Sequence, residues 1–397
     1  MKERFPTARS KALPDADRVA RCARVPELGP KLLFLTGGTA MRPLTRVVKS
    51  YTHNTVHLIT PFDSGGSSAK LRDAFDMLSV GDVRNRLLAL ADETARGNPE
   101  IHELLANRLD VAASQEDLIA ELQGMIAGDH PLVAAILEPT RHLIRNHLEW
   151  FRERMPAAFD LRGASIGNLV LAGGYLENDR DVVAVISLVA RLVRARGVVR
   201  PITEASLHLE AELADGSRVV GQHRITGKEH QPLGQRIVDL GLVGPKGSEQ
   251  VNLGANDSVL DLIREADLIC FPLGSFWTSI VANLLPAGVG TAIAEARAPK
   301  VFVPNAGEDP EQFGMKIHDC VEVLHRKVCD DVGEDVSLAR VLDVVLCDSV
   351  GADYGDRLDL DRLAALGVEV LDLPLVTERS ETMLDPKPLA EVLLTLA

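Results

Sequence analysis

The stretch KLLFLTGGTA at residues 31–40 decides the fold. Its apolar first part has the length of a buried strand, Gly37-Gly38-Thr39 follows directly, and helical spacing begins at Met41. The stretch therefore predicts a strand, a tight turn and a helix. Glycines in such a turn let the backbone approach a phosphate, and the start of the helix offers N–H groups to it. A tight turn that serves only the fold would give the same pattern.

Similar apolar runs further along the chain predict the other strands. They lie at 55–60, 267–271, 300–304, 341–347 and 368–373, with helical spacing between them. Strands that alternate with helices predict an α/β fold of the Rossmann-like type, with a doubly wound, mostly parallel sheet.

Two segments interrupt this alternation. Residues 99–158 have helical spacing and almost no strand-like run, which predicts a helical insertion that caps the site. Alternating apolar residues around Asp215-Gly216 predict a small β-hairpin excursion. The expected division is an N-terminal arm (1–30), partly mobile, a nucleotide-binding domain (31–98 and 159–397) and the helical insertion (99–158).

Composition limits the classes of function. The chain has 397 residues and a formal charge of −14, and this acidic excess argues against a general nucleic-acid binder. No apolar run is long enough to span a bilayer, and the five scattered cysteines suggest a reducing compartment. We therefore expect a soluble, cytoplasmic protein without membrane or nucleic-acid partners, with a homodimer as the default assembly.

The second glycine-containing turn carries more chemistry than the first. Asp63-Ser64-Gly65-Gly66-Ser67-Ser68 follows the second predicted strand and precedes Lys70 and Arg72. Two glycines, two hydroxyl groups, a carboxylate and two cations suit a phosphate or a Mg²⁺–phosphate group. A flexible solvated loop would have a similar composition. Asp82, in the next helix, is either a helix cap or a site residue, and Arg84 and Asn85 follow it in the first helical turn.

A third turn, Pro272 to Ser279, again follows a strand and opens a helix. Ser275 could be a plain helix cap, whereas Asn283 lies in an otherwise apolar helical stretch. Three small-residue turns after strands predict one ligand site at the switch point of the sheet. The dinucleotide fingerprint and an acidic residue at the expected place are both absent, which argues against an NAD-dependent oxidoreductase. The P-loop pattern is absent as well.

Two other motifs are interpreted as structural. Gly163-Ala164-Ser165-Ile166-Gly167 matches the nucleophile-elbow pattern, but a charged segment precedes it where that motif requires a strand. The series His318, Cys320, His325 and Cys329 suggests zinc, but on a helix Cys320 points away from the other three. We therefore expect neither a serine hydrolase nor a zinc site from these residues.

Six segments together resemble a known family. They are GGT (37–39), DSGGSSAKLRDAFDML (63–78), GDVRNRLLALAD (81–92), GASIGNLVLAG (163–173), ADLICFPLGSFWTSIVANLLPAGV (266–289) and KVFVPNAG (300–307). Their order and spacing resemble the family of YvcK-like gluconeogenesis factors and of CofD, the 2-phospho-L-lactate transferase. Within it, the chain is more similar to the YvcK side, and it resembles a divergent CofD-related branch, that of the GAK system.

The resemblance implies a nucleotide site at the strand ends. CofD transfers a phospholactyl or phosphoenolpyruvyl group from a guanosine-diphosphate-activated donor to a deazaflavin with Mg²⁺, whereas YvcK-like proteins bind UDP-sugars. The expected function is transfer of a phosphoester-linked group from a nucleoside-diphosphate-activated donor. The alternative is a non-enzymatic regulator that binds a UDP-sugar.

Carried over position by position, the resemblance implies these site residues. Asp63, Asp82 and Arg84 would be catalytic, and Asp63 and Asp82 would bind Mg²⁺. The ligand would contact Gly37, Gly38, Thr39, Gly65, Gly66, Ser67, Ser68, Lys70, Asn85, Gly167, Asn168, Gly274, Ser275, Thr278, Ser279, Asn283 and Asn305.

Two positions depart from the family pattern. Ala40 replaces the last glycine of GGTG, and a positive φ there would be costly for alanine. Ser64 replaces the second of two adjacent acids, which belongs to the acceptor side in CofD-like enzymes. The second change argues against a deazaflavin acceptor, whereas phosphate binding is compatible with both.

Overall fold

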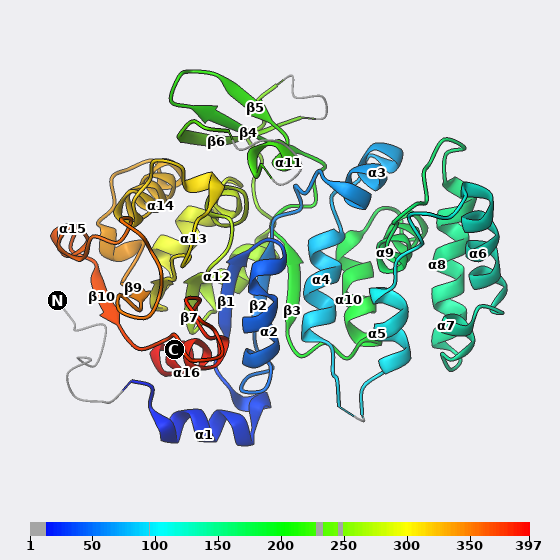
Figure 1. The fold of residues 1–397 in the computed structure, drawn as a ribbon, viewed down its shortest axis with the longest axis horizontal. Helices are drawn as coiled ribbons and strands as arrows, with labels where there is room; N and C mark the ends of the chain where they lie inside the picture. The colour runs from blue at the N-terminus through cyan, green and yellow to red at the C-terminus, as the bar shows by residue number, and fades with distance from the viewer. Residues whose placement is uncertain (1–12, 95, 228–232, 245–248) are drawn as a thin grey trace.

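The computed structural model describes residues 13–94, 96–227, 233–244 and 249–397. A seven-stranded sheet of order β10-β9-β8-β7-β1-β2-β3 forms its centre, and all its strand pairs are parallel (Figure 1). The strands are β1 (Leu32–Thr36), β2 (Val56–Ile59), β3 (Val198–Pro201), β7 (Leu268–Phe271), β8 (Lys300–Phe302), β9 (Val344–Cys347) and β10 (Glu369–Asp372). The predicted α/β fold with a doubly wound, mostly parallel sheet is confirmed.

The strand order reverses between β1 and β7, in the middle of the sheet. From β1 the chain continues to β2 and β3 on one side, whereas β7 begins the run to β8, β9 and β10 on the other. Leu33 of β1 pairs with Val56 of β2 and with Ile269 of β7. The ends of these three strands therefore lie together at the switch point, where open α/β sheets bind ligands.

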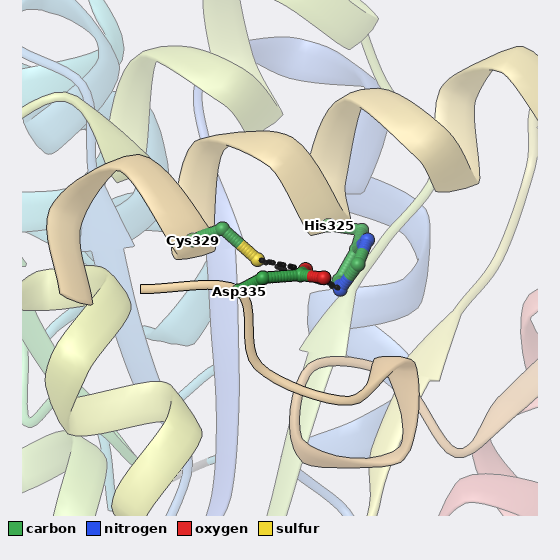
Figure 2. A group of neighbouring side chains, drawn as sticks. All are labelled: His325, Cys329 and Asp335. Atoms are coloured by element: carbon green, nitrogen blue, oxygen red, sulfur yellow. Dashed lines mark hydrogen bonds and ion pairs between the residues drawn. The ribbon is translucent and has the colours of Figure 1, made fainter. Parts of the chain in front are cut away.

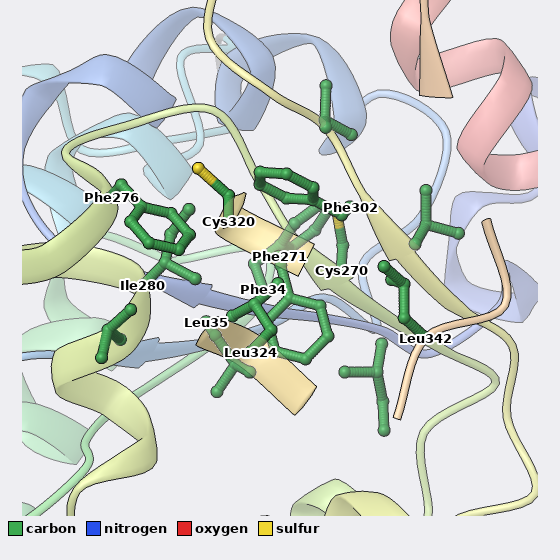
Figure 3. Packing of buried hydrophobic residues seen from close by; sticks show 14 of the residues in the cluster. Phe34, Leu35, Cys270, Phe271, Phe276, Ile280, Phe302, Cys320, Leu324 and Leu342 are labelled. Atoms are coloured by element: carbon green, nitrogen blue, oxygen red, sulfur yellow. The ribbon is translucent and has the colours of Figure 1, made fainter. Parts of the chain in front are cut away.

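The central strands are apolar because helices cover the sheet. All five residues of β1 are buried, as parallel sheets require when both faces are covered. Figure 3 shows Phe34 of β1 and Phe302 of β8 in one cluster with Leu324 of α14 (Ile317–Val332). The other helices that alternate with the strands of the large sheet or follow them are α2 (Arg42–Val48), α3 (Gly66–Phe75), α12 (Asp257–Arg264), α13 (Val289–Glu295), α15 (Leu360–Ala365) and α16 (Pro386–Leu396).

Residues 99–158 contain helices and no strand. The helices are α5 (Pro99–Ala106), α6 (Gln115–Ala127), α7 (Pro131–Ala134) and α8 (Thr140–Arg154). They build a second hydrophobic core with α4 (Gly81–Leu90), α9 (Ile166–Glu177) and α10 (Val182–Leu192). Figure 1 shows this helical group beyond β3, to one side of the sheet.

A small antiparallel sheet stands over the carboxyl end of the large one (Figure 1). Its strands are β4 (His208–Leu213), β5 (Arg218–Val220) and β6 (Ile237–Val243), and α11 (Gln222–Ile225) follows β5. The predicted hairpin corresponds to β4 and β5. The strands β6 and β3 were not predicted from the sequence. The latter has four residues and ends in Pro201, which an edge strand tolerates but a strand pattern does not favour.

The start of the described chain is helical. Residues 1–12 of the predicted arm lie outside the described residues, whereas Ala16–Arg24 forms α1, which packs against α16. Asp15 caps α1 by accepting the N–H of Arg18 at 3.0 Å. Throughout the described ranges, no helix combines the length and the apolar character needed to cross a membrane.

Candidate functional site

A pocket of about 250 Å³ lies at the carboxyl ends of the central strands. All three small-residue turns reach it, together with the start of α4 and helix α11. Its walls consist of Thr36, Gly37, Gly38, Thr39, Ala40, Met41, Asp63, Gly65, Asp82, Gln222, His223, Thr226, Leu273, Gly274, Ser275 and Ser279. The structure thus brings three segments that are distant in sequence to one cavity.

The first turn rests on the buried guanidinium of Arg86, a residue of α4. Nη2 of Arg86 donates to the carbonyl oxygens of Gly37 and Gly38 and to Thr36 Oγ1, at 3.2 Å in each case. Nη1 donates to Thr45 Oγ1 on α2. One side chain therefore ties together the end of β1, the turn and the following helix.

These bonds also orient the amides of the turn. In a trans peptide the C=O group and the following N–H point in opposite directions. With the carbonyls of Gly37 and Gly38 directed at Arg86, the N–H groups of Gly38 and Thr39 point to the opposite side. Burial lowers the pKa of Arg86 to about 10 against the opposing effect of Asp82, so the guanidinium stays charged at neutral pH.

Gly37 is in close contact with the helix of the third turn. A methyl group at Gly37 would lie 2.4 Å from Ser279 Oγ and 2.9 Å from Ser279 Cβ. Real Cβ atoms do not approach other atoms so closely, so the first turn packs at this distance only with glycine at position 37.

Gly37→Ala is expected to lower the melting temperature, because overpacking of this kind costs about 1–3 kcal/mol. The double variant Gly37→Ala/Ser279→Gly should recover part of the loss, since it removes the two atoms within 3.0 Å of the added methyl group and leaves Thr60 Oγ1, at 3.1 Å, in place. Calorimetry of the single and double variants measures the recovery. Gly124→Ala in α6 is the control, because nothing lies within 4 Å of the added methyl group there. If the double variant melts no higher than Gly37→Ala, the contact with Ser279 is not the reason that position 37 requires glycine.

Two carboxylates border the same glycine-lined space. Asp63 Oδ1 accepts the N–H of Gly65 at 3.1 Å, and a methyl group at Gly81 would lie 3.5 Å from Asp63 Oδ2. A methyl group at Gly38 would lie 3.2 Å from Asp82 Oδ1. Among the described residues that line the pocket there is no Lys or Arg. A phosphate in the pocket would therefore meet two negative charges at short range.

Asp63 and Asp82 suit a Mg²⁺ ion that also binds phosphate. Mg²⁺ in proteins is commonly held by one or two carboxylates together with phosphate oxygens. Both carboxylates line one pocket and both offer oxygen ligands. The donor set therefore fits a metal–phosphate group better than a free phosphate.

The third turn is already supplied with carboxylates of its own. Asp309 Oδ2 accepts the N–H of Phe276 at 3.0 Å, and Glu311 accepts both the N–H and the hydroxyl of Thr278, at 2.8 and 2.6 Å. The helix here begins as a π-helical turn, Phe276–Ile280, instead of the regular helix expected. These amide groups therefore bind the protein's own anions, and the first turn is the better position for a phosphate.

Comparison with known proteins gives the family. The family of 2-phospho-L-lactate transferase CofD matches residues 32–376. The chain belongs to the CofD family. The resemblance of the six segments to the family of CofD and the YvcK-like gluconeogenesis factors is thereby confirmed.

Two relatives of this CofD-family protein, and the solved structure of a similar protein, agree with the match. The gluconeogenesis factor of Bacillus subtilis is 28% identical over 362 residues, which cover 89% of this chain and 93% of that protein. A protein from Nostoc sp. is 30% identical over 297 residues, 75% of this chain, and the match spans about half (52%) of the Nostoc protein. A solved structure of a UPF0052-family protein from Bacillus halodurans has 25% identity and a TM-score of 0.66, over 92% of this chain and 99% of the other.

Several site residues implied by the CofD resemblance lie outside the pocket wall. They are Gly66, Ser67, Ser68, Lys70, Arg84, Asn85, Gly167, Asn168, Thr278, Asn283 and Asn305. Lys70 is directed elsewhere, because its Nζ pairs with the Asp160 carboxylate at 2.9 Å and donates to the Arg162 carbonyl. It is an anchor for the segment before α9 and not a contact of the pocket.

Arg84, expected to be catalytic, is buried and does not line the pocket either. Its guanidinium donates to Ser165 Oγ and, at 2.6 Å, to Asn85 Oδ1, and burial lowers the pKa of Arg84 to about 10. A methyl group at Gly167 would lie 2.7 Å from Arg84 Cδ, so Gly167 makes room for this side chain. Ser165 is fully buried and no strand leads into α9, which agrees with a structural role for the G-x-S-x-G segment.

Three further polar residues of the CofD pattern, Asn168, Asn283 and Asn305, fasten the turns and the end of β1 to neighbouring elements. Asn168 Nδ2 donates to Ser67 Oγ at 3.1 Å, and Asn283 Nδ2 donates to the Thr36 carbonyl at 3.0 Å. Asn305 holds Gly274 from both sides, accepting its N–H at 2.7 Å and donating to its carbonyl at 2.6 Å. These residues position the pocket walls without lining them.

The pocket wall formed by α11 in this CofD-family protein was not predicted from the sequence. Ser64 Oγ lies 2.7 Å from His223 Nδ1 and accepts the N–H of His223, so α11 is fastened to the second turn. These residues are 159 positions apart, and no local pattern connects them. In the described chain no residue of 99–158 lines the pocket, so the small sheet with α11 borders it and the helical insertion does not, contrary to the expectation of a helical cap.

The departure at Ala40 has no steric cost here. Ala40 lies in a short 3-10 helix, Thr39–Met41, and is not among the described residues with positive φ. The first turn of this CofD-family protein therefore accepts alanine without a shift of the loop.

Proposed function

We propose that this CofD-family protein binds a nucleoside diphosphate or a nucleotide-activated small molecule and transfers a phosphoester-linked group from it. The observation that supports the proposal is a single pocket, at the switch point of the sheet, lined by glycine turns and two carboxylates. In a pocket of this kind, main-chain amides hold phosphate oxygens and a divalent cation neutralises them.

Each part of the pocket has a distinct role in this proposal. The amides of Gly38 and Thr39, turned outward by Arg86, would bind one phosphate. Asp63 and Asp82 would hold Mg²⁺, which screens the charge of the diphosphate. Because Asp63 is kept in place by the Gly65 N–H, little reorganisation is needed when the metal–phosphate group binds.

The transfer step follows from the chemistry of a diphosphate. A hydroxyl oxygen of the acceptor forms a bond to the distal phosphorus, and the bond from that phosphorus to the bridging oxygen breaks. The nucleoside monophosphate leaves with the bridging oxygen, and the hydroxyl proton passes to a base. His223 is the imidazole in the pocket wall and is the residue that we propose for this role. Ser64, bonded to His223, would then position it.

A thermal-shift panel of GDP, GTP, UDP, UDP-N-acetylglucosamine, NAD and ATP, with Mg²⁺ or with a chelator, tests the binding. A true ligand at 100 times its Kd stabilises by about 2.7 kcal/mol, so the melting temperature should rise with GDP, and the rise should be much smaller with the chelator than with Mg²⁺. No shift with any diphosphate would overturn the proposal.

A second measurement separates catalysis from sensing. Release of nucleoside monophosphate from a bound donor, followed by chromatography in the presence of hydroxyl acceptors, is expected if the protein is a transferase. Binding of a UDP-sugar without turnover would instead support a non-enzymatic regulator.

A further inference from the structure

Three side chains that bind metals in other proteins meet at the end of α14, outside the nucleotide pocket (Figure 2). His325 and Cys329 are four residues apart on this helix and therefore lie on one face of it. Gly333, with φ of 79°, ends the helix and turns the chain back, so that Asp335 lies against the same face. The group thus combines an imidazole, a thiol and a carboxylate from two turns of helix and one loop.

The distances between the three groups are close to those of a tetrahedral metal site. Cys329 Sγ lies 3.4 Å from His325 Nε2 and 3.7 Å from Asp335 Oδ1, and His325 Nε2 lies 3.9 Å from Asp335 Oδ1. Zinc bonds of about 2.3 Å to sulfur and about 2.0–2.1 Å to nitrogen and oxygen give ligand separations of roughly 3.3–3.6 Å in a regular tetrahedron. Binding requires a shift of about half an ångström in the exposed side chain of Asp335. It also requires the Val336 carbonyl oxygen, which lies 2.6 Å from His325 Nε2, to turn away from the metal position.

We propose that His325 Nε2, Cys329 Sγ and the Asp335 carboxylate bind a zinc ion, with water in the fourth position. Thiolate and imidazole ligands favour Zn²⁺ over Mg²⁺ or Ca²⁺, and three protein ligands with one water is a common zinc coordination. The proposal does not depend on the nucleotide pocket.

The protonation of the ligands sets the conditions for binding. In the structure His325 Nε2 lies 2.6 Å from the carbonyl oxygen of Val336, a distance at which the imidazole donates. Zinc binding requires this proton on Nδ1 instead, and it requires Cys329 as the thiolate. The affinity for zinc should therefore fall as the pH is lowered.

The site would fasten a loop to a helix. Val336 is buried in a small cluster with Ala294, Val328 and Val341, directly after Asp335. A zinc ion at Asp335 would hold this loop on α14 and stabilise the cluster. Cys320 and His318, which the sequence placed in the same series, are not in the group; Cys320 is buried, and burial raises the pKa of its thiol.

Thiol reactivity gives a direct test with the full chain, prepared without a histidine tag and stripped of metal with a chelator. All five cysteines lie in the described ranges, and Cys329 alone is not buried. A chromogenic aromatic disulfide should therefore react rapidly with one thiol, and Zn²⁺ should slow that reaction at least ten-fold. In a parallel titration Co²⁺ should give a sulfur-to-cobalt charge-transfer absorption, absent in Cys329→Ser.

Matched variants identify the other two ligands. His325→Ala and Asp335→Asn should each weaken zinc binding at least ten-fold, whereas Asp330→Asn and Glu334→Gln, exposed neighbours of the group, should leave it unchanged. Melting curves of the metal-free variants verify that they are folded. The proposal is overturned if zinc leaves the thiol reaction unaltered, if cobalt gives no sulfur band, or if His325→Ala binds zinc as the parent does.

Discussion

Replacing Arg86 by methionine is expected to lower the free energy of unfolding by about 3–5 kcal/mol, because the change leaves several buried acceptors without a donor. The carbonyl oxygens of Gly37 and Gly38 and the hydroxyls of Thr36 and Thr45 all bond to this guanidinium. Methionine fills much of the volume but donates no hydrogen bond. Denaturation followed by fluorescence measures the effect, since buried Trp277 lies in the helix of the third turn.

Two controls separate charge from geometry at Arg86. Arg86→Lys keeps the charge but cannot reach all four acceptors at once, so its stability should lie between those of the parent and the methionine variant. Arg46→Met, on α2, removes a half-exposed side chain whose weak ion pair with Glu93 spans 3.3 Å, and it should change stability by about 0.5 kcal/mol or less. Equal midpoints for the parent and Arg86→Met would show that the first turn does not depend on the guanidinium.

The second large effect is expected at Asp82. Asp82→Asn should weaken Mg²⁺-dependent nucleotide binding by about 10–100-fold, because it removes one of the two carboxylates available to the metal. Without Mg²⁺ the order should reverse, and the variant should bind the diphosphate more tightly than the parent, since one repelling charge is gone. Titration calorimetry with and without Mg²⁺ shows whether the two affinities cross.

The matched controls for Asp82 are two other carboxylates. Asp63→Asn should behave like Asp82→Asn, whereas Asp73→Asn, exposed on α3 and outside the pocket wall, should bind as the parent does. The melting temperature of each variant without ligand is needed first, because Asp82 also lies in the field of Arg86. Nucleotide affinity that keeps its full dependence on Mg²⁺ in both Asp82→Asn and Asp63→Asn would remove these residues from the metal site.

The sheet was predictable from sequence because its strands are buried on both faces. Apolar runs such as LLFLT of β1 and LICF of β7 stand out against the polar chain, and the glycines that follow mark the strand ends. The four-residue β3, with its terminal proline, gives no such signal. The π-helical start at Phe276 was also hidden, because it coincides with amides that bond to Asp309 and Glu311, more than thirty residues later.

The glycine turns of the site were predictable from the sequence, whereas the side chains that border the pocket from α4 and α11 were predicted only in part. Arg84 and Arg86 are two residues apart on α4 and so point to nearly opposite sides of the helix. Of the two, Arg86 lies four residues after Asp82 and therefore on the same face of the helix. Because Asp82 borders the pocket, this spacing could have predicted that Arg86, and not Arg84, lies next to the pocket wall. His223 offered no comparable sign, because its contact with Ser64 forms only in the folded chain.

Asp309 and Glu311 make the pocket asymmetric. The N–H groups at the start of the helix after β7 already donate to these two carboxylates, so a bound anion would have to displace the carboxylates to reach them. A bound molecule should consequently enter with its charged end toward β1 and its uncharged end toward Leu273. Compounds that are anionic at both ends should be poor competitors, and compounds anionic at one end only should be preferred.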